Sequence, residues 1–106
     1  MDIRDIKERI VELRNALKKN DIRGDIFILY GSYATGKNRK DSDIDIAVVS
    51  RDFGRDRFRE GSTLNYIAQK IDVRFEAVPV DLKEYMSRHS ISPLLAEIDK
   101  NGIVLL

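Results

Sequence analysis

The stretch GSYATGKNRKDSDID, residues 31–45, lies between two short apolar segments and holds most of the chemically informative residues of the chain. The segment before it, Ile26–Tyr30, and the segment at its end, residues 44–49, consist mainly of β-branched and other apolar residues. Both are therefore predicted to be buried strands, the first of them stopped by Gly31. Residues 33–40 are polar and contain a glycine, which predicts one helical turn followed by a loop.

Two amphipathic helices are predicted around these strands, because apolar residues recur there at spacings of three and four. The first helix ends near Asn20 and Gly24, and its apolar stripe is Ile3, Ile6, Ile10, Leu13 and Leu17. The second follows a charged connector at residues 50–57, and its apolar residues are Phe58, Leu64, Ile67, Ala68 and Ile71.

The same patterns predict the remaining elements: a strand at residues 73–80, short helices at residues 82–88 and 93–100, and a last strand at residues 103–106. The order αβ(α)βαβααβ contains no repeat and no linker. It indicates an α/β (α+β) fold in which one small mixed β-sheet is flanked by helices, with a single domain at residues 1–106.

Composition limits the function classes. The chain has 106 residues, 42% of them apolar and 35% charged, which is typical of one soluble globular domain. Its 19 Lys and Arg residues nearly balance its 18 Asp and Glu residues, so no bulk attraction to nucleic acid or membrane is expected. The absence of cysteine excludes disulfides, thiolate zinc sites and thiol nucleophiles. The short apolar runs and the charged N-terminal residues predict a cytoplasmic protein without a signal peptide.

The spacing of Gly31, Gly36 and Lys37 matches the P-loop pattern G-x-x-x-x-G-K, but the residues that follow do not. A P-loop needs Ser or Thr next to hold magnesium, and the chain has Asn38 there. It must also open a long helix whose amides face the phosphates, whereas a charged loop and a strand follow here. The P-loop interpretation is therefore rejected.

Asp41, Asp43 and Asp45 have the first spacings of an EF-hand calcium loop. The sixth position of such a loop requires glycine for its sharp turn, and the chain has Ile46 there. The apolar residues that follow supply no oxygen ligands, so this interpretation is rejected as well.

Asp43 and Asp45 are better explained as metal ligands on the second strand. Residues two apart on a strand point to the same face, with α-carbons roughly 6.5 Å apart. Two carboxylates on an apolar strand are costly unless a cation neutralises them, and magnesium prefers such oxygen ligands. A pair of ions about 3.5–4 Å apart is the arrangement used in phosphoryl transfer. The alternative is a charged strand entrance that pairs with Arg39 or Lys40.

The other half of the predicted site comes from Gly31 and Ser32. A glycine directly after a buried strand lets the backbone approach a phosphate closely, and Ser32 adds a hydroxyl. Lys37, Arg39 and Lys40 place three positive charges beside this turn, suited either to a polyphosphate or to a solvated loop.

Gly31-Ser32, Gly36, Ser42-Asp43 and Asp45 resemble the G-S…S-D-x-D signature of the DNA polymerase beta-like nucleotidyltransferase superfamily. The chain is most similar to its stand-alone branch, the minimal nucleotidyltransferases (MNT), from about residue 25 to residue 80. The resemblance implies a nucleotidyltransferase fold with both aspartates on the second strand as catalytic magnesium ligands. The nucleotide-binding residues that it implies are Gly31, Ser32, Gly36, Lys37 and Ser42.

In this family a third carboxylate on the third strand completes the metal site and activates the acceptor hydroxyl. The chain has no Asp-x-Val pattern there, and by strand parity Asp72, Arg74 and Glu76 share one face while Asp81 lies on the other. Glu76, in the middle of the predicted strand, is similar to the third-strand acidic position of some family members. The resemblance therefore implies Glu76 as the third catalytic and metal-binding residue, with Asp72 in reserve.

The resemblance implies magnesium-dependent transfer of a nucleoside monophosphate from an NTP, expected to be ATP, to an acceptor hydroxyl. It also implies a small helical HEPN-type protein as partner, because MNT proteins are often paired with one and some modify it as antitoxins. The alternative is a module with the same fold that binds nucleotide or regulates a HEPN-type protein without catalysis. The unusual third carboxylate favours that alternative. The acceptor, the preferred base and homo-oligomerisation stay open.

Overall fold

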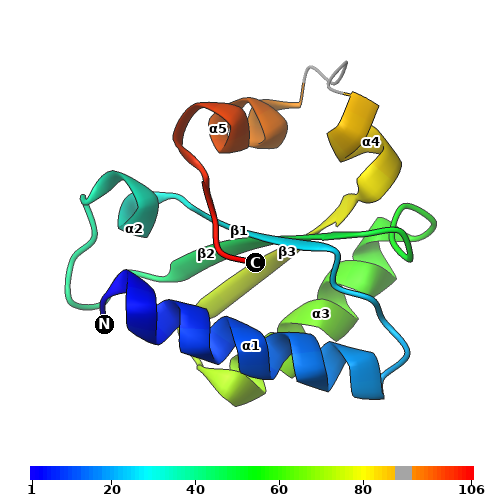
Figure 1. Cartoon of the computed structure of the whole chain (residues 1–106), viewed down its shortest axis with the longest axis horizontal. Coiled ribbons are helices and arrows are strands. Elements are labelled where there is room, and N and C mark those ends of the chain that lie inside the picture. The colour runs from blue at the N-terminus through cyan, green and yellow to red at the C-terminus, as the bar shows by residue number, and fades with distance from the viewer. Residues whose placement is uncertain (88–91) are drawn as a thin grey trace.

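The computed structural model describes residues 1–87 and 92–106, which form a four-stranded sheet with helices on both faces (Figure 1). The elements are α1 (Ile3–Lys19), β1 (Ile26–Tyr30), α2 (Ser32–Thr35), β2 (Ile44–Ser50), α3 (Arg57–Ile71), β3 (Phe75–Asp81), α4 (Leu82–Ser87), α5 (Pro93–Asn101) and β4 (Ile103–Val104). The predicted fold class and element order are confirmed. No helix in the described ranges combines the length and the apolar character needed to cross a bilayer.

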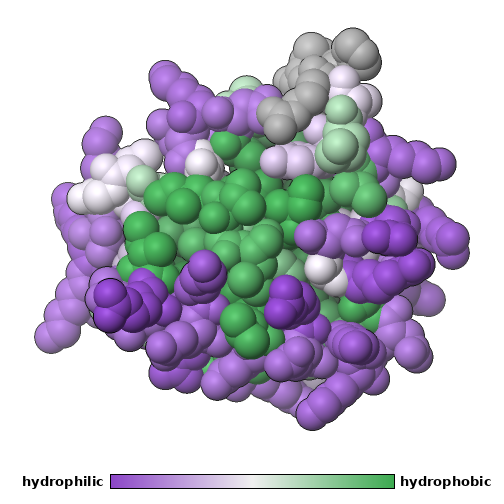
Figure 2. Space-filling model, viewed as in Figure 1, coloured by the Kyte–Doolittle hydropathy of each residue, from purple (hydrophilic) through white to green (hydrophobic). Residues whose placement is uncertain are grey.

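The sheet has the strand order β3-β2-β1-β4. β1 runs antiparallel to both β2 and β4, while β2 and β3 are parallel and are joined through α3. The sheet is therefore mixed, with β2 and β1 in its centre and β3 and β4 at its edges. The middle of the face seen in Figure 2 is apolar and is surrounded by polar residues. Val104 of the edge strand β4 is 60% exposed.

Side chains of β2 alternate between two buried apolar clusters, one on each face of the sheet. Ile44, Ile46 and Val48 belong to the larger cluster with the buried residues of α1 and α3. Ala47 and Val49 point to the other face and belong to the smaller cluster with residues of α5. Figure 1 shows the same division, with α1 and α3 on one side of the sheet and α4 and α5 on the other.

Helix α1 is fixed at both ends by local hydrogen bonds. Asp2 and Asp5 form a reciprocal capping box at its start, and the Asn20 amide donates to carbonyls of the last turn. Four of the five predicted stripe residues are buried, but Ile3 is 45% exposed, so its assignment to the core is wrong. Ile3 is the first residue of the helix, and the N-terminal end of α1 lies at the outer edge of the molecule (Figure 1).

Helix α3 buries Leu64, Ile67 and Ala68, as predicted, but Phe58 is 86% exposed. The prediction that Phe58 belongs to the apolar face is wrong, and the helix period explains why. Phe58 lies six positions before Leu64, which at 3.6 residues per turn is about 120° away around the helix. It therefore lies outside the stripe that packs on the sheet.

Two side chains of α3 form hydrogen bonds with backbone groups at the open edge of β3. The Asn65 side chain accepts a hydrogen bond from the Ala77 amide at 2.9 Å and donates one to the Ala77 carbonyl at 2.6 Å. The Gln69 side chain donates to the Phe75 carbonyl at 3.2 Å. These two amides take the place of a neighbouring strand and leave β3 less available for edge-to-edge pairing.

The boundaries of several elements differ from the predictions. β2 and α5 each end one residue later than predicted, at Ser50 and Asn101. β3 begins at Phe75 and not at Val73, because residues 72–74 form a turn in which the Phe75 amide donates to the Asp72 carbonyl, and Val73 is 82% exposed. β4 covers Ile103–Val104 and not residues 103–106. α4 is described to Ser87, and the predicted last residue of that helix, Arg88, lies outside the described residues.

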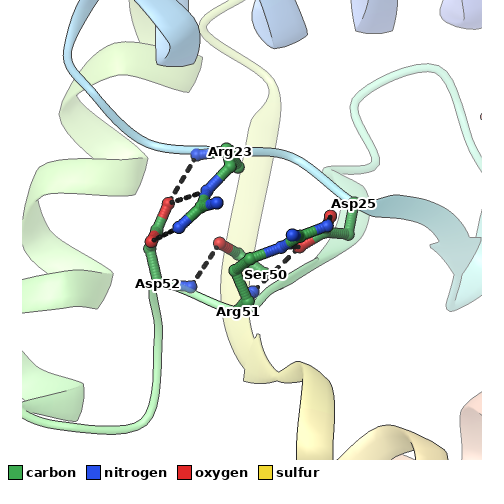
Figure 3. A network of polar contacts seen from close by, with 5 residues as sticks. All are labelled: Arg23, Asp25, Ser50, Arg51 and Asp52. Atoms are coloured by element: carbon green, nitrogen blue, oxygen red, sulfur yellow. Dashed lines mark hydrogen bonds and ion pairs between the residues drawn. The ribbon is translucent and has the colours of Figure 1, made fainter.

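A polar network joins the loop before β1 to the residues after β2 (Figure 3). Arg23 pairs with Asp52 at 2.9 Å and Arg51 pairs with Asp25 at 2.8 Å, each through its guanidinium group. The buried Ser50 hydroxyl accepts a hydrogen bond from the Asp52 amide. These contacts fix the C-terminal end of β2, the end farthest from the aspartates of the predicted site.

Candidate functional site

The glycine-serine turn and Asp45 lie directly against each other. In the antiparallel pairing of β1 and β2, Tyr30 is opposite Asp45, so Gly31 emerges beside the first residues of β2. Gly31 has φ +73°, a backbone conformation that favours glycine. A Cβ at this position would collide with the Asp45 carboxylate. Both the backbone angle and the close approach therefore require glycine here.

The two aspartates differ in environment. Asp45 lies within β2 and is half-buried, on the face that α5 covers, whereas Ile44 and Ile46 point to the larger core. Asp43 is exposed and lies one residue before β2, so the expectation that both aspartates are on the strand is wrong. The Asp43 charge nevertheless acts on Asp45.

Asp45 is surrounded by negative charge. Burial, together with the carboxylates of Glu76, Asp43 and Glu97, raises the pKa of Asp45 from 3.8 to about 6. Within residues 1–87 and 92–106, no hydrogen-bond donor or cation contacts its carboxylate. A half-buried carboxylate with only like charges as neighbours is the environment that a bound cation would stabilise.

Glu76 lies beside Asp45 because β2 and β3 are parallel and these two residues are register partners. Glu76 is exposed, and its charge contributes to the raised pKa of Asp45. The reserve residue, Asp72, is not on β3 at all: it is the C-cap of α3, and its carboxylate pairs with Arg74 at 2.9 Å. Strand parity does not apply to Asp72, and of the two candidates Glu76 is the one that the structure brings to Asp45.

The fourth acidic residue, Glu97 of α5, was not predicted from the sequence. Its carboxylate accepts a hydrogen bond from the Gly31 amide at 3.1 Å, between residues 66 positions apart. The signal for it was local: Glu97 lies three residues after Leu94 and one before Ile98, within the apolar stripe that packs α5 on the sheet. An acidic residue within such a stripe indicates a buried polar contact.

Tyr30 borders the same group of carboxylates. Burial, followed by the charges of Asp45, Glu76 and Glu97, raises the pKa of Tyr30 to about 12. The phenol is therefore neutral at physiological pH. Its ring packs against the smaller apolar cluster, in agreement with a core role for this residue.

The loop between α2 and β2 is held by its own hydrogen bonds. Gly36 is the left-handed C-cap of α2, and the Lys37 amide donates to the Ser32 carbonyl at 2.9 Å. The Ser42 hydroxyl accepts from the Arg39 amide at 2.7 Å, which closes a turn before Asp43. The side chains of Lys37, Arg39 and Lys40 are exposed. Nucleotide contacts by Gly36, Lys37 and Ser42 stay a prediction.

The carboxylates are close, but they do not converge on one point. In the part of the chain that the structure describes, no three His, Asp or Glu side chains are arranged to hold a single metal ion. Coordination of one ion by Asp43, Asp45 and Glu76 would therefore need side-chain rotation, which the exposed Asp43 and Glu76 side chains permit. This ligand set stays a prediction.

Comparison with known families and structures gives one consistent result. The family model described as nucleotidyltransferase domain matches residues 10–106. A toxin–antitoxin crystal structure with AMP-PNP contains a chain with 28% identity and a TM-score of 0.55, and the alignment covers 94% of this chain and 72% of that one. A mutant of the toxin–antitoxin pair MntA–HpeT gives 26% identity, a TM-score of 0.53 and the same coverage of both chains.

A third similar structure is that of a tri-AMPylated Shewanella oneidensis HEPN toxin in complex with its MNT antitoxin. The matched chain has 25% identity and a TM-score of 0.52, with coverage of 98% of this chain and 71% of that one. No curated protein matches the sequence.

Proposed function

The chain belongs to the nucleotidyltransferase domain family, and from that premise we propose that it transfers a nucleoside monophosphate from a magnesium-bound NTP to an acceptor hydroxyl. The observation that carries the proposal is the contact between the Asp45 carboxylate and the glycine-serine turn at Gly31. This contact supports a single site in which Asp45 would bind the cation and the turn would bind the phosphates. ATP is the expected nucleotide, since a similar toxin–antitoxin structure contains AMP-PNP.

The chemistry of the donor set fits magnesium. Hard cations of this kind prefer carboxylate oxygens, which Asp43, Asp45 and Glu76 supply. Among residues 1–87 and 92–106, no Lys or Arg competes with the cation for Asp45. A bound magnesium would neutralise charge on the triphosphate and on the leaving pyrophosphate. Asp43 and Asp45 would hold it, and Glu76 would complete the ligand set.

Side chains and backbone groups of the chain would carry out substrate positioning and proton transfer. The Gly31 turn and the Ser32 hydroxyl would bind and orient the triphosphate, so that its α-phosphorus faces the acceptor. Glu76 would accept the proton of the acceptor hydroxyl as its oxygen forms a bond to the α-phosphorus. The bond to the leaving pyrophosphate then breaks. Catalysis would depend chiefly on positioning and charge neutralisation.

The proposed acceptor is a hydroxyl on a small helical HEPN-type protein. The support is the similar structure in which an AMPylated HEPN toxin is bound to its MNT antitoxin. Incubation of the chain with such a partner, magnesium and ATP should add adenylyl groups to the partner, detectable by intact-mass spectrometry. Transfer to no partner, despite demonstrated ATP binding, would favour the alternative of a regulatory module. The absence of three convergent carboxylates in the described residues is the observation in favour of that alternative.

Nucleotide binding itself is tested by substitution of the aspartates. Asp43→Asn and Asp45→Asn remove a ligand charge with little change of shape, and each should abolish magnesium-dependent ATP binding in isothermal titration calorimetry. Asp41→Asn, in the same exposed loop, is the matched control and should bind like the wild type. Wild-type affinity in both Asp43→Asn and Asp45→Asn would disprove the site.

A further inference from the structure

Glu97 reaches the glycine-serine turn from a distant part of the chain. It lies on α5, while Gly31 follows β1, and the Gly31 amide donates to Glu97 Oε2 at 3.1 Å. The contact is half-buried on the face of the sheet that carries Asp45. An anionic oxygen therefore already lies on a backbone amide of the turn to which the proposed function assigns the triphosphate.

The position of Glu97 is fixed by the packing of α5. Leu95 and Ile98 are buried against the sheet, and a Cβ at Gly102 would approach the Ile28 side chain to 2.9 Å, so the helix end lies close to β1. The helix backbone has little freedom to move away. A glutamate side chain, in contrast, has three rotatable bonds and leaves the amide by rotation alone.

The carboxylates of Asp45 and Glu97 repel each other. Among the described residues, the charged groups that act on Asp45 are Glu76 of β3, Asp43 before β2 and Glu97. The hydrogen bond from Gly31 stabilises Glu97 against this repulsion. A magnesium-bound triphosphate offers its own anionic oxygens to the same amide and brings a cation that the carboxylates attract.

We propose that Glu97 is an internal competitor for nucleotide, whose carboxylate occupies the Gly31 amide and must be displaced before a triphosphate can bind the turn. The inference rests on the proposed function. It assigns to α5 a direct effect on nucleotide affinity. The carboxylate and a phosphate oxygen are both anionic and compete for the single N–H of Gly31.

Calorimetric titration with magnesium and ATP of the wild type, Glu97→Gln and Glu97→Ala tests the proposal. Gln keeps an oxygen that accepts from Gly31 but removes the charge, whereas Ala removes both. We expect the dissociation constant to fall in the order wild type, Gln, Ala, with a total decrease on the order of tenfold, equivalent to about 1.4 kcal/mol. Glu12→Gln, an exposed carboxylate on α1, controls for net charge and should leave the affinity unchanged.

A positioning role for Glu97 would give a different order of ATP affinities among the three proteins. If Glu97→Ala binds ATP more weakly and Glu97→Gln restores the affinity, Glu97 positions the turn and the competition model is wrong. Equal affinity in all three proteins overturns it too, while the proposed function stands. If no protein binds ATP, the proposed function fails and the competition with it.

Nuclear magnetic resonance of the Gly31 amide examines the contact separately from affinity. Glu97→Ala should shift the Gly31 amide proton upfield, since the hydrogen bond to a carboxylate is lost. Saturating magnesium and ATP should then bring the wild-type and Ala spectra to the same Gly31 position. A Gly31 resonance that still differs between the two saturated proteins would show that the carboxylate stays in place when nucleotide binds.

Discussion

Replacement of Asp45 by asparagine should stabilise the protein at neutral pH when no divalent cation is present. The Asp45 pKa is raised from 3.8 to about 6, so the folded chain keeps a proton that the unfolded chain releases above pH 4. Stability from this group is therefore present below pH 4 and is lost as the pH rises through about 6. Asparagine has the same shape beside Gly31 and cannot ionise, so the variant avoids this loss.

The magnitude follows from the size of the shift. Two pKa units correspond to about 2.7 kcal/mol, which we reduce to about 1.5 kcal/mol because water screens a half-exposed carboxylate. In a domain of this length the difference is about 6–10 °C in the melting temperature. Urea unfolding at pH 4 and pH 8, with EDTA, should give equal stabilities at pH 4 and a more stable Asp45→Asn variant at pH 8.

Magnesium and ATP should make the wild type more stable than Asp45→Asn, because a ligand that binds only the folded wild type stabilises it by mass action. Titrating groups that do not interact with Asp45 are common to both proteins and cancel in the difference. The reasoning would be refuted by a stability difference that does not change with pH. It would be refuted equally by a variant that magnesium and ATP stabilise as much as the wild type.

Two further substitutions test the geometry of the site and of the sheet edge. Gly31→Ala should cost more stability than Gly36→Ala and should abolish ATP binding. The Gly31 backbone (φ 73°, ψ −152°) lies in a region used almost only by glycine and its Cβ would collide with Asp45, whereas Gly36 is in the αL region with open space around it; the αL strain at Gly36 costs about 1–2 kcal/mol. Equal unfolding free energies for the two variants would show that the close approach is unimportant. Asn65→Ala should cost about 2–4 kcal/mol in chemical denaturation, since it leaves the Ala77 amide and carbonyl without partners. A loss below about 0.5 kcal/mol, the size of an ordinary surface substitution, would contradict that role.

Elements of the fold could be predicted correctly from the sequence where the residue pattern of a single segment determines them. β1 was predicted with its observed limits, because β-branched and aromatic residues are followed at once by Gly31. The expectation that residues two apart on this strand share a face holds for β2 from Ile44 onward, since Ile44, Ile46 and Val48 belong to one cluster and Ala47 and Val49 to the other. Phe58 was misassigned although the helix period excluded it, and Val73 was misassigned because a β-branched residue in a turn resembles the start of a strand.

The site was only partly predictable, since its members come from four separate segments. The contact between Gly31 and Asp45 follows from the register of β1 and β2, and the proximity of Glu76 to Asp45 follows from the register of β2 and β3. A spacing pattern indicates that such residues belong together but fixes no register. The apolar stripe of α5 indicated a buried polar contact for Glu97, but not that Gly31 is its partner, because the packing of α5 on the sheet depends on side chains far apart in the chain.

The central proposal is that the aspartates before and within β2 and the turn after β1 form a single site for a cation and a polyphosphate. The most direct test is anomalous X-ray diffraction from crystals grown with manganese, which substitutes for magnesium, and a non-hydrolysable ATP analogue. The account predicts a manganese peak bound by Asp43 and Asp45, with the triphosphate on Gly31 and Ser32. A manganese peak away from both aspartates, or a triphosphate bound elsewhere on the molecule, would contradict it.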